Sequence, residues 1–506
     1  MRAGSRPITA KLYNYSDHPA TKQRLGWSGT GEVMSSWKDG EAVQTRRKGA
    51  LARLVACAGA CAVVTAGAVV IVPAASATAA ARPLAATSAA CAAATGSPGI
   101  TKTTINTGAM STLTGPIASN FESLAPGIQA YYDYVNAHGG VDGRKIQLTY
   151  NTDDTGNPSQ DTALEHTLVD QDHVFAVAGV ATAFFTPTYF VQTCTPTFGY
   201  NVTGNWSGPE NLFAAGGSVQ DYAAGDPAWI YLAKQVEKTP SVGVLAYNIA
   251  ASNGSCNQAI SAFKQAGIKV SYQDTSIGYG ASVTPDTERM KAAGTNFILS
   301  CMDVTGNISL ARGVKQYGIQ AKQLWLNGND VSTLNQYQDL MQGVYFNIQH
   351  VPFDAPLNKF PGLAQYVSAM KKYEPKYLYD EVGLQGWQSA ALLVAGLKAA
   401  GPNPTQIGVI NAINKMTDDT ANGLTTPTNW TPGGGGHTYP ITNNSCSGFI
   451  QVQGDKYVTV IAKKPQVFVC FRLSGSILNG SGDSPGNSYT HAVPISNPAG
   501  TPAPVG

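Results

Sequence analysis

A hydroxyl-rich turn at residues 111–116 (STLTGP) is the stretch best suited to binding a small molecule. It follows residues 105–110, which alternate as in a β-strand, and a long amphipathic helix is expected after it. Strand, polar turn and helix in this order place small hydrogen-bonding groups at the carboxyl edge of a sheet, where open α/β sheets hold their ligands. The sequence therefore predicts a ligand-binding edge here, although Ser111 and Thr112 could equally serve as turn or capping residues.

Patterns for catalysis or metal binding have little support. Residues 482–486 (GDSPG) match G-x-S-x-G, but no strand precedes them and Pro485 stands where a nucleophile elbow needs a helix. The chain has no H-E-x-x-H pair, no Gly-Lys of a P-loop and no Cys-x-x-Cys. We therefore expect a protein that is not an enzyme and that carries no cofactor and no metal.

Strand and helix periodicities alternate along the chain from residue 105 onward. The first series has strands expected at 145–152, 174–180 and near 198, with helices between them. The series then restarts, with strands expected at 241–247, 268–272, 296–300, 323–326 and 343–348. Two long helices are expected at 360–373 and 382–400, and a hairpin at 448–452 and 457–461. Repeated βα units predict parallel sheets covered by helices on both faces.

Length and charge limit the class of protein. A chain of 506 residues can form two or more compact domains. Residues 1–77 contain 10 of the 33 basic and 4 of the 31 acidic residues, which leaves 23 basic and 27 acidic residues in the remainder. That remainder has no basic stripe of the kind that binds a phosphate backbone, so we expect no nucleic-acid partner.

The amino-terminal region predicts export. Residues 46–48 (RRK) precede an apolar run at 54–72, and residues 75–77 (ASA) fit a signal-peptidase site, so we expect a leader and signal peptide over 1–77. A retained membrane anchor is the alternative, because the apolar run is close to the length that spans a bilayer. Residues 78–98 are expected to be a low-complexity tether, and residues 474–506 a disordered tail. The expected location is extracytoplasmic, secreted or associated with the cell surface.

Six cysteines remain after the expected cleavage, which favours disulfides in an exported chain but allows fifteen pairings. Cys446 and Cys470 flank the predicted hairpin, and Cys256 and Cys301 lie in neighbouring βα units. We therefore predict these two pairs, which leaves Cys91 to pair with Cys194.

Several motifs, taken in order, resemble the leucine/isoleucine/valine-binding branch of the type I periplasmic solute-binding proteins that serve ABC transporters. They are the turn 113–116 (LTGP), the helix end 135–141 (VNAHGGV), residues 143–148 (GRKIQL), the pair Asp153-Asp154, residues 180–183 (VATA) and residues 291–297 (KAAGTNF). The order and spacing of these motifs are specific, and the resemblance extends from about residue 99 to about residue 470.

The resemblance implies an α/β fold with two Rossmann-like lobes, each with a parallel sheet, joined by three hinge crossovers. It places lobe 1 at 99–217 and 350–420, lobe 2 at 218–349 and 421–473, and the crossovers near 215–220, 347–352 and 418–425. It also implies a monomer that captures a small polar solute (an amino acid, an amide or a related carboxylate) and delivers it to an ABC permease. Two alternatives remain: a sensor of the same fold that serves no transporter, and a secreted α/β hydrolase.

Carried over motif by motif, the resemblance implies binding residues at the carboxyl edges of both sheets. Lobe 1 should supply Ser111, Thr112, Ala181, Thr182, Ala183, Tyr200 and Asn201. Lobe 2 should supply Ser252, Asn253, Asp303, Asn327, Asn329 and Asp330. The lobe 1 hydroxyls and the helix start near Phe185 should hold a carboxylate. Asp303 or Asp330 should meet an ammonium group, although either could cap a helix. Ser252 and Asp303 replace aromatic residues that are common in the family, so the resemblance does not fix an amino acid as the ligand.

Overall fold

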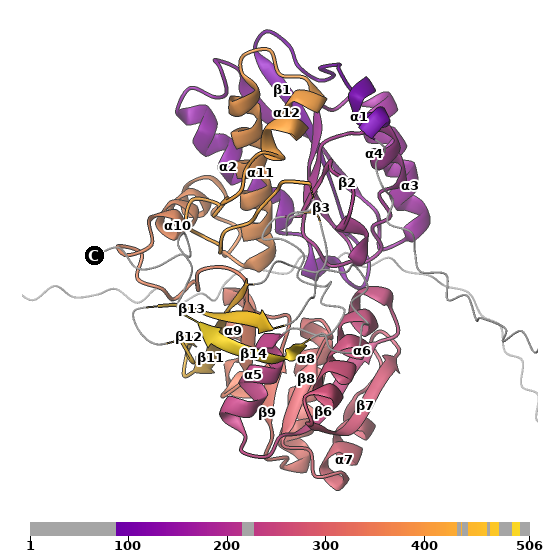
Figure 1. The fold of residues 1–506 in the computed structure, drawn as a ribbon, viewed down its shortest axis with the longest axis vertical. Coiled ribbons are helices and arrows are strands. Elements are labelled where there is room, and N and C mark those ends of the chain that lie inside the picture. Colours follow the sequence, from indigo (N-terminus) through magenta and orange to yellow (C-terminus); the bar gives the residue numbers. More distant parts are fainter. Residues whose placement is uncertain are drawn as a thin grey trace, which may run out of the picture. The chain divides into compact units, whose positions relative to one another are not determined.

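The computed structural model describes residues 88–214, 227–432, 437, 444–462, 466–474 and 488–495, which form two sheets and their helices (Figure 1). The first sheet, on which lobe 1 is built, has the strand order β2-β1-β3-β4-β5, and all its pairings are parallel. Its strands are β1 (Thr104–Ser111), β2 (Lys145–Asp153), β3 (Ala176–Ala181), β4 (Thr197–Gly199) and β5 (Leu212–Ala214).

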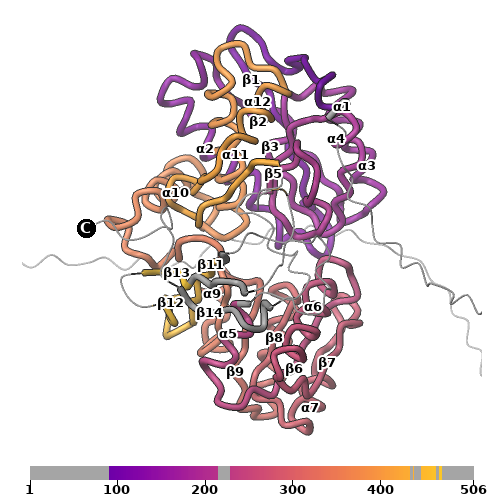
Figure 2. Tube along the Cα trace, viewed as in Figure 1, coloured from indigo at the N-terminus to yellow at the C-terminus, as the bar shows by residue number. Residues whose placement is uncertain are grey.

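Helices from two distant parts of the chain complete lobe 1. The crossovers of the first sheet supply α2 (Leu124–Ala137), α3 (Pro158–His166) and α4 (Thr188–Thr193), with a π-helical turn at Thr167–Gln171, and α1 (Ser88–Ala93) precedes the sheet. The chain returns much later with α10 (Pro361–Tyr373), α11 (Glu381–Ala400) and α12 (Gln406–Ile413), as Figure 2 shows. Helix α11 packs against α2, β3 and β4, so the late segment is an integral part of this lobe.

The second sheet, on which lobe 2 is built, is mixed rather than parallel throughout. Its parallel part consists of β6 (Ser241–Tyr247), β7 (Lys269–Ile277), β8 (Phe297–Ser300), β9 (Lys322–Trp325) and β10 (Tyr345–Ile348). Four antiparallel strands extend it: β11 (Asn444–Gln453), β12 (Lys456–Thr459), β13 (Phe468–Ser474) and β14 (Ser488–Ile495). The helices of this lobe are α5 (Pro227–Val236), α6 (Ala250–Gln265), α7 (Thr284–Ala292), α8 (Val304–Tyr317) and α9 (Val331–Met341).

The α/β class and the parallel first sheet are confirmed, but four features differ from the sequence prediction. Helix α1 lies inside the stretch 78–98 that was expected to be a low-complexity tether, and its Cys91 is buried and bonded to Cys194. The second sheet is mixed because β11, which returns after α10, α11 and α12, pairs antiparallel with β10, and β12 and β13 then pair antiparallel with β11. Strand β14 lies inside the stretch expected to be a disordered tail, where β13 offers it a free edge. Helices α9 and α12 were not predicted; both begin with a capping side chain, Asp330 and Thr405 respectively.

Two of the segments that run between the sheets lie next to each other. His350 forms an isolated antiparallel bridge with Thr425, and the Val351 amide donates to the Leu424 carbonyl at 2.7 Å. The third predicted crossover, near 215–220, falls outside the described residues. The exact lobe boundaries remain a prediction.

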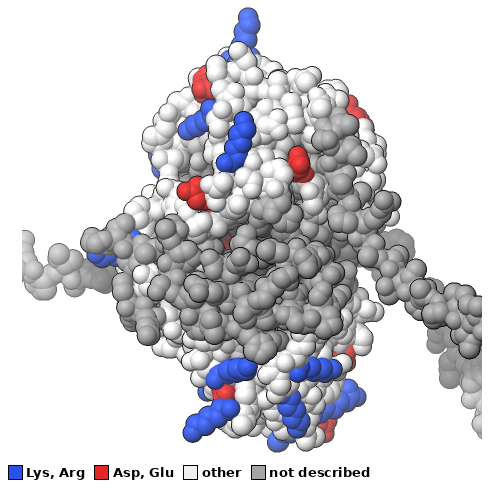
Figure 3. Space-filling view, in the orientation of Figure 1, with Lys and Arg blue, Asp and Glu red and all other residues white. Residues whose placement is uncertain are grey.

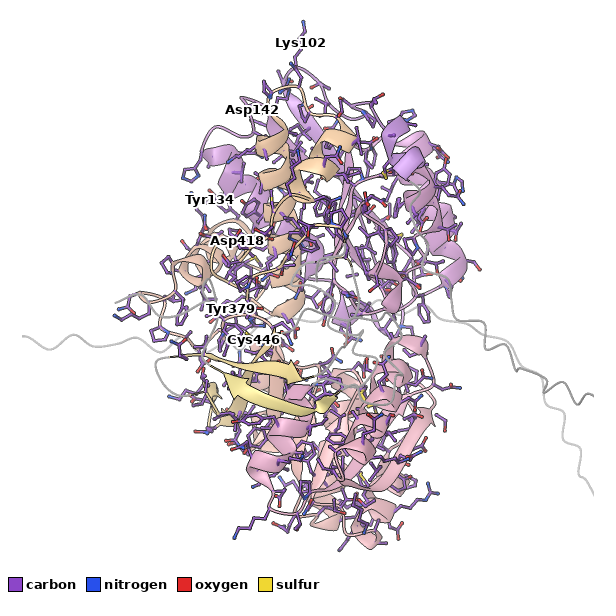
Figure 4. All side chains as sticks on the ribbon, viewed as in Figure 1. Lys102, Tyr134, Asp142, Tyr379, Asp418 and Cys446 are labelled. Atoms are coloured by element: carbon purple, nitrogen blue, oxygen red, sulfur yellow. A yellow bond between two sulfur atoms is a disulfide. The ribbon has the colours of Figure 1, made fainter. Side chains whose placement is uncertain are left out.

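Disulfides fix elements in both lobes. Cys91 pairs with Cys194, and Cys256 pairs with Cys301, as predicted. Cys446, labelled in Figure 4, is also disulfide-bonded, and the register of β11 and β13 places it opposite Cys470.

Helices α2 and α11 approach each other closely because glycines form their contact. A Cβ atom added to Gly127 would lie 1.9 Å from the Gly383 carbonyl oxygen, and one added to Gly386 would lie 2.1 Å from the Leu124 carbonyl oxygen. Apolar side chains of α11, among them Leu384 and Trp387, are buried around this contact. The contact therefore fixes the position at which α11 begins.

We predict that Gly127→Ala lowers the free energy of unfolding by about 1–3 kcal/mol, the usual cost of overpacking, because neither backbone can move away freely. Gly254→Ala on α6 is the control, since an added Cβ there meets nothing within 4 Å. The control should leave stability unchanged or raise it by up to about 1 kcal/mol. Urea unfolding followed by circular dichroism measures both, and equal stability of the two variants would contradict the prediction.

Candidate ligand-binding pocket

A cavity of about 520 Å³ lies at the carboxyl ends of strands from both sheets. Its lining comes from the segments that follow β1, β3, β4, β6, β7, β8 and β9, and from the segment that leads into α11. The volume is in the range of small-molecule sites, and the position is the edge at which open α/β sheets bind ligands. The geometry therefore indicates a site for one small organic molecule.

Three of the helices that begin at this pocket, α8, α9 and α11, are capped by an aspartate, whereas α2 and α6 begin after Ser123 and Ile249 without a side-chain cap. Asp303 accepts from the Gly306 amide at 2.9 Å at the start of α8, and Asp330 accepts from the Thr333 amide at the start of α9. Asp380 accepts from the Gly383 amide at 2.6 Å at the start of α11. Such caps satisfy amide groups that a helix leaves unpaired, and their negative charge is favourable at the positive end of the helix dipole.

Asp303 also connects the two lobes. Its carboxylate accepts hydrogen bonds from Tyr247 and Tyr279, both at 2.8 Å, and from the Asn120 amide of lobe 1 at 3.1 Å. The Tyr279 hydroxyl lies 3.0 Å from the Pro116 carbonyl oxygen, also in lobe 1. Together with the Gly306 amide, four groups donate to the Asp303 carboxylate. This carboxylate therefore connects the two lobes and has little capacity left to bind a ligand.

The start of α11 carries a second carboxyl group that differs from the caps. Glu381 lines the pocket, keeps part of its surface open, and has no hydrogen-bond partner among the described residues. Burial, with smaller contributions from Asp380 and Asp330, raises the pKa of Glu381 to about 8. Tyr200 also lines the pocket with its hydroxyl unpaired within the described ranges, and burial followed by Glu381 and Asp380 raises the pKa of Tyr200 well above 10.

Asp380 is held more firmly than Glu381. Ser123 donates to it at 2.8 Å in addition to the cap bond, yet burial outweighs these hydrogen bonds and raises the pKa of Asp380 to about 6. Tyr379, labelled in Figure 4, packs edge-to-face against Phe353 with ring centroids 5.5 Å apart. This contact helps to fix the segment that precedes α11. The backbones of Asp380 and Asp330 form a bridge, so the two caps lie side by side.

The structure places about half of the residues predicted from sequence on the pocket wall. Those that line it are Ala183, Tyr200, Ser252, Asp303, Asn327, Asn329 and Asp330. Those that do not line it are Ser111, Thr112, Ala181, Thr182, Asn201 and Asn253. Their contact with a ligand remains a prediction that this arrangement does not favour.

The hydroxyls of Ser111, Thr112 and Thr182 are not on the pocket wall because these residues are buried at the ends of their strands. Ser111 and Thr112 are fully buried and their hydroxyls have no partner, and both amide atoms of Asn201 are likewise buried and unpaired. Thr182 accepts from the Phe184 amide at 3.2 Å, which is the local turn role.

Several lobe 2 residues on the wall are committed to internal bonds. Ser252 accepts from the Tyr247 amide at 2.8 Å and donates to the Cys301 carbonyl at 2.7 Å. Asn329 lies 3.1 Å from His350 Nε2, and the other ring nitrogen lies 2.8 Å from the Val351 carbonyl. Burial lowers the pKa of His350 to about 4, so the ring is neutral and its Nε2 accepts from Asn329.

Sequence reasoning missed Glu381, Asp380 and the tyrosines at 247 and 279. Asp380 and Glu381 stand directly before a strongly apolar helix, which is a typical N-cap signal and would have marked them. The tyrosines carry no such signal, because nothing local in the sequence shows that they face a cavity.

Two α/β lobes whose sheets present their carboxyl edges to one pocket define the class of two-lobed solute receptors. The periplasmic binding protein family model matches residues 104–454, and the chain belongs to this family. The sequence-based resemblance is thereby confirmed. Membership implies an extracytoplasmic location. Within the described residues, no helix has both the length and the apolar character needed to cross a bilayer.

Relatives and solved structures agree with this assignment. The chain is 26% identical over 326 residues to the Leu/Ile/Val-binding protein homolog 3 of Brucella melitensis, covering 61% of this chain and 83% of that protein. A fatty acid ABC transporter substrate-binding protein from Thermomonospora curvata superposes with a TM-score of 0.61 at 20% identity, covering 72% and 92% of the two chains. A branched-chain amino acid ABC transporter protein from Thermus thermophilus with bound valine gives 0.61 at 15% identity, covering 71% and 96%.

We predict that Tyr279→Phe loosens the contact between the two lobes, because it removes the one O–H group that Asp303 and the lobe 1 Pro116 carbonyl share, a hydrogen bond worth about 0.5–1.5 kcal/mol. Tyr272→Phe is the matched control. The Tyr272 hydroxyl donates to Asp286 over a distance of 2.6 Å, and neither residue lines the pocket. Fluorescent labels at the exposed Lys102 and Lys264 report the distance between the lobes. Energy transfer should fall in the first variant only, and the same transfer in both variants would refute the interlobe role of Tyr279.

Proposed function

We propose that the protein is a non-enzymatic receptor that captures a small polar organic solute in the pocket and presents the closed complex to an ABC permease. The observation that carries the proposal is the single pocket lined by both lobes, bridged by the hydrogen bonds of Asn120 and Tyr279. A solute that contacts both walls favours the closed arrangement, because only closure completes all its contacts.

The proteins to which the chain is similar support this proposal. Their ligands are leucine, isoleucine or valine for the first, a fatty acid for the second, and valine for the third. They span amino acids and a simple carboxylate, so a small organic solute is the shared element. The solute of this chain is inferred from its own pocket.

A thermal-shift screen of residues 78–506 against amino acids, amides, carboxylates and amines tests solute binding. A solute at about 100 times its Kd should add about 2.7 kcal/mol of stability. Ala183→Trp should abolish the shift, because Ala183 lines the pocket and a large ring would fill it. Ala292→Trp, on the exposed end of α7, is the control and should retain it. Absence of a shift with every class would remove the support for solute capture.

Coupling to transport needs its own measurement. Deleting the gene should abolish cellular uptake of the solute identified in the screen, and the Ala183→Trp protein should fail to restore uptake. Unchanged uptake in the deletion strain would favour a sensor of the same fold.

A further inference from the structure

The pocket wall is acidic. Its described residues include five carboxyl side chains and one amine, that of Lys376, which lies exposed at the rim. The carboxyl groups belong to Glu122, Asp303, Asp330, Asp380 and Glu381. On the face shown in Figure 3, the described basic side chains gather mainly at the lower end of the molecule. The described pocket wall is instead mostly acidic.

Three helix starts at the pocket are already occupied by protein carboxylates, whereas α2 and α6 begin after Ser123 and Ile249 without a side-chain cap. Helix starts bind carboxylates and phosphates because their amide groups are unpaired and their dipole ends are positive. At the starts of α8, α9 and α11, an aspartate carboxylate of the protein occupies this place. These carboxylates accept hydrogen bonds from the Gly306, Thr333 and Gly383 amides, respectively. A solute carboxylate would meet three negative caps instead of three free helix ends.

Glu381 is the carboxyl group left over. The other buried acids of the wall, Asp303, Asp330 and Asp380, all accept hydrogen bonds from the protein, whereas Glu381 accepts none from the described residues. The charged or titratable groups that act on or beside it are Asp380 on its own helix, Asp330 at the start of α9, Tyr200 after β4 and Tyr457 on β12. None of these is a cation.

Tyr200 provides an independent indication of a ligand at the same place. Its side chain is 8% exposed, it lines the pocket, and its hydroxyl has no partner in the described part of the chain. The Tyr200 hydroxyl is not among the fully buried unpaired atoms, so it opens onto the pocket and is available to a ligand. The Tyr200 hydroxyl and the Glu381 carboxylate can both accept hydrogen bonds from an N–H group.

The rest of the wall suits an organic cation rather than a metal ion. No group of three or more His, Cys, Asp or Glu residues in the described ranges is arranged to hold a metal. Tyrosine rings line the pocket instead, including Tyr247 and Tyr279 with centroids 5.0 Å apart, and apolar side chains such as Val202 and Leu326 lie among them. Aromatic faces attract cations, and apolar side chains accept a carbon skeleton.

We propose that the solute is a protonated organic amine without a free carboxylate, and that Glu381 and the Tyr200 hydroxyl bind its ammonium group. This inference rests on the proposed function, because it names the class of solute that the same pocket captures.

Three probes that share one carbon skeleton test the charge of the solute. Isoamylamine, leucine and isocaproate carry an ammonium group, both groups and a carboxylate, respectively. Titration calorimetry on residues 78–506 should show the tightest binding for isoamylamine, weaker binding for leucine, and none for isocaproate. Binding of leucine or isocaproate more tightly than isoamylamine would overturn the amine assignment but leave solute capture standing. No binding of any probe, together with a failed general screen, would overturn both.

Variants test the two residues. Glu381→Gln should weaken isoamylamine binding at least about tenfold, since a hydrogen bond to a charged group is lost. Glu288→Gln, the same change at an exposed acid on α7 that does not line the pocket, is the matched control and should change affinity less than about threefold. Tyr200→Phe removes only the hydroxyl and should weaken binding with the fold unchanged by circular dichroism. Equal affinity of wild type and Glu381→Gln would refute the role of Glu381.

The pH dependence gives a readout that a purely structural role would not move. Because burial raises the pKa of Glu381 to about 8, the group is largely protonated at pH values near 6 and attracts a cation poorly. Isoamylamine stays protonated over this range, so its affinity should rise as the pH increases from about 6 to about 8. The rise should be much smaller in Glu381→Gln, where the ionisation of Asp380, whose pKa is raised by burial to about 6, still contributes. A flat profile in the wild type would contradict the assignment.

Discussion

The pocket depends on three aspartates that begin helices at the same edge. Asp303, Asp330 and Asp380 each satisfy amide groups at a helix start, which a helix cannot satisfy internally. Because the helices belong to both lobes, these caps fix the positions of the walls on either side. They also shape the electrostatics of the pocket, since each places a carboxylate at the positive end of its helix.

Asp303 shows how one carboxylate can both cap a helix and connect the two lobes. It caps α8 and at the same time accepts hydrogen bonds from Tyr247, Tyr279 and Asn120. Burying a carboxylate is expensive unless its oxygens are paired, and four donors meet that requirement. The donors come from separate parts of the chain, so the carboxylate is fully satisfied only when both lobes contribute. Closure and the stability of this buried group are therefore linked.

The sequence predicts the fold better than it predicts the pocket wall, for a physical reason. Strands such as 241–247 and helices such as 382–400 are set by local periodicity, and the structure contains both, with α11 beginning one residue earlier. Whether a polar side chain faces a cavity depends instead on what covers it. Ser111 and Thr112 stand at the expected strand end yet are buried, whereas Tyr279 follows an edge strand and reaches the other lobe. The mixed second sheet escaped prediction because its antiparallel strands come from short segments far along the chain.

The Cys256–Cys301 disulfide links the structure of the pocket wall to the redox state of the compartment that holds the protein. Cys301 lines the pocket directly after β8, and its carbonyl accepts from Ser252 on the same helix that carries Cys256. This wall is therefore joined covalently only in a compartment that oxidises thiols. A chain with reduced thiols lacks this covalent link between the pocket wall and α6. The link therefore forms in the same kind of compartment as the extracytoplasmic location that the family implies.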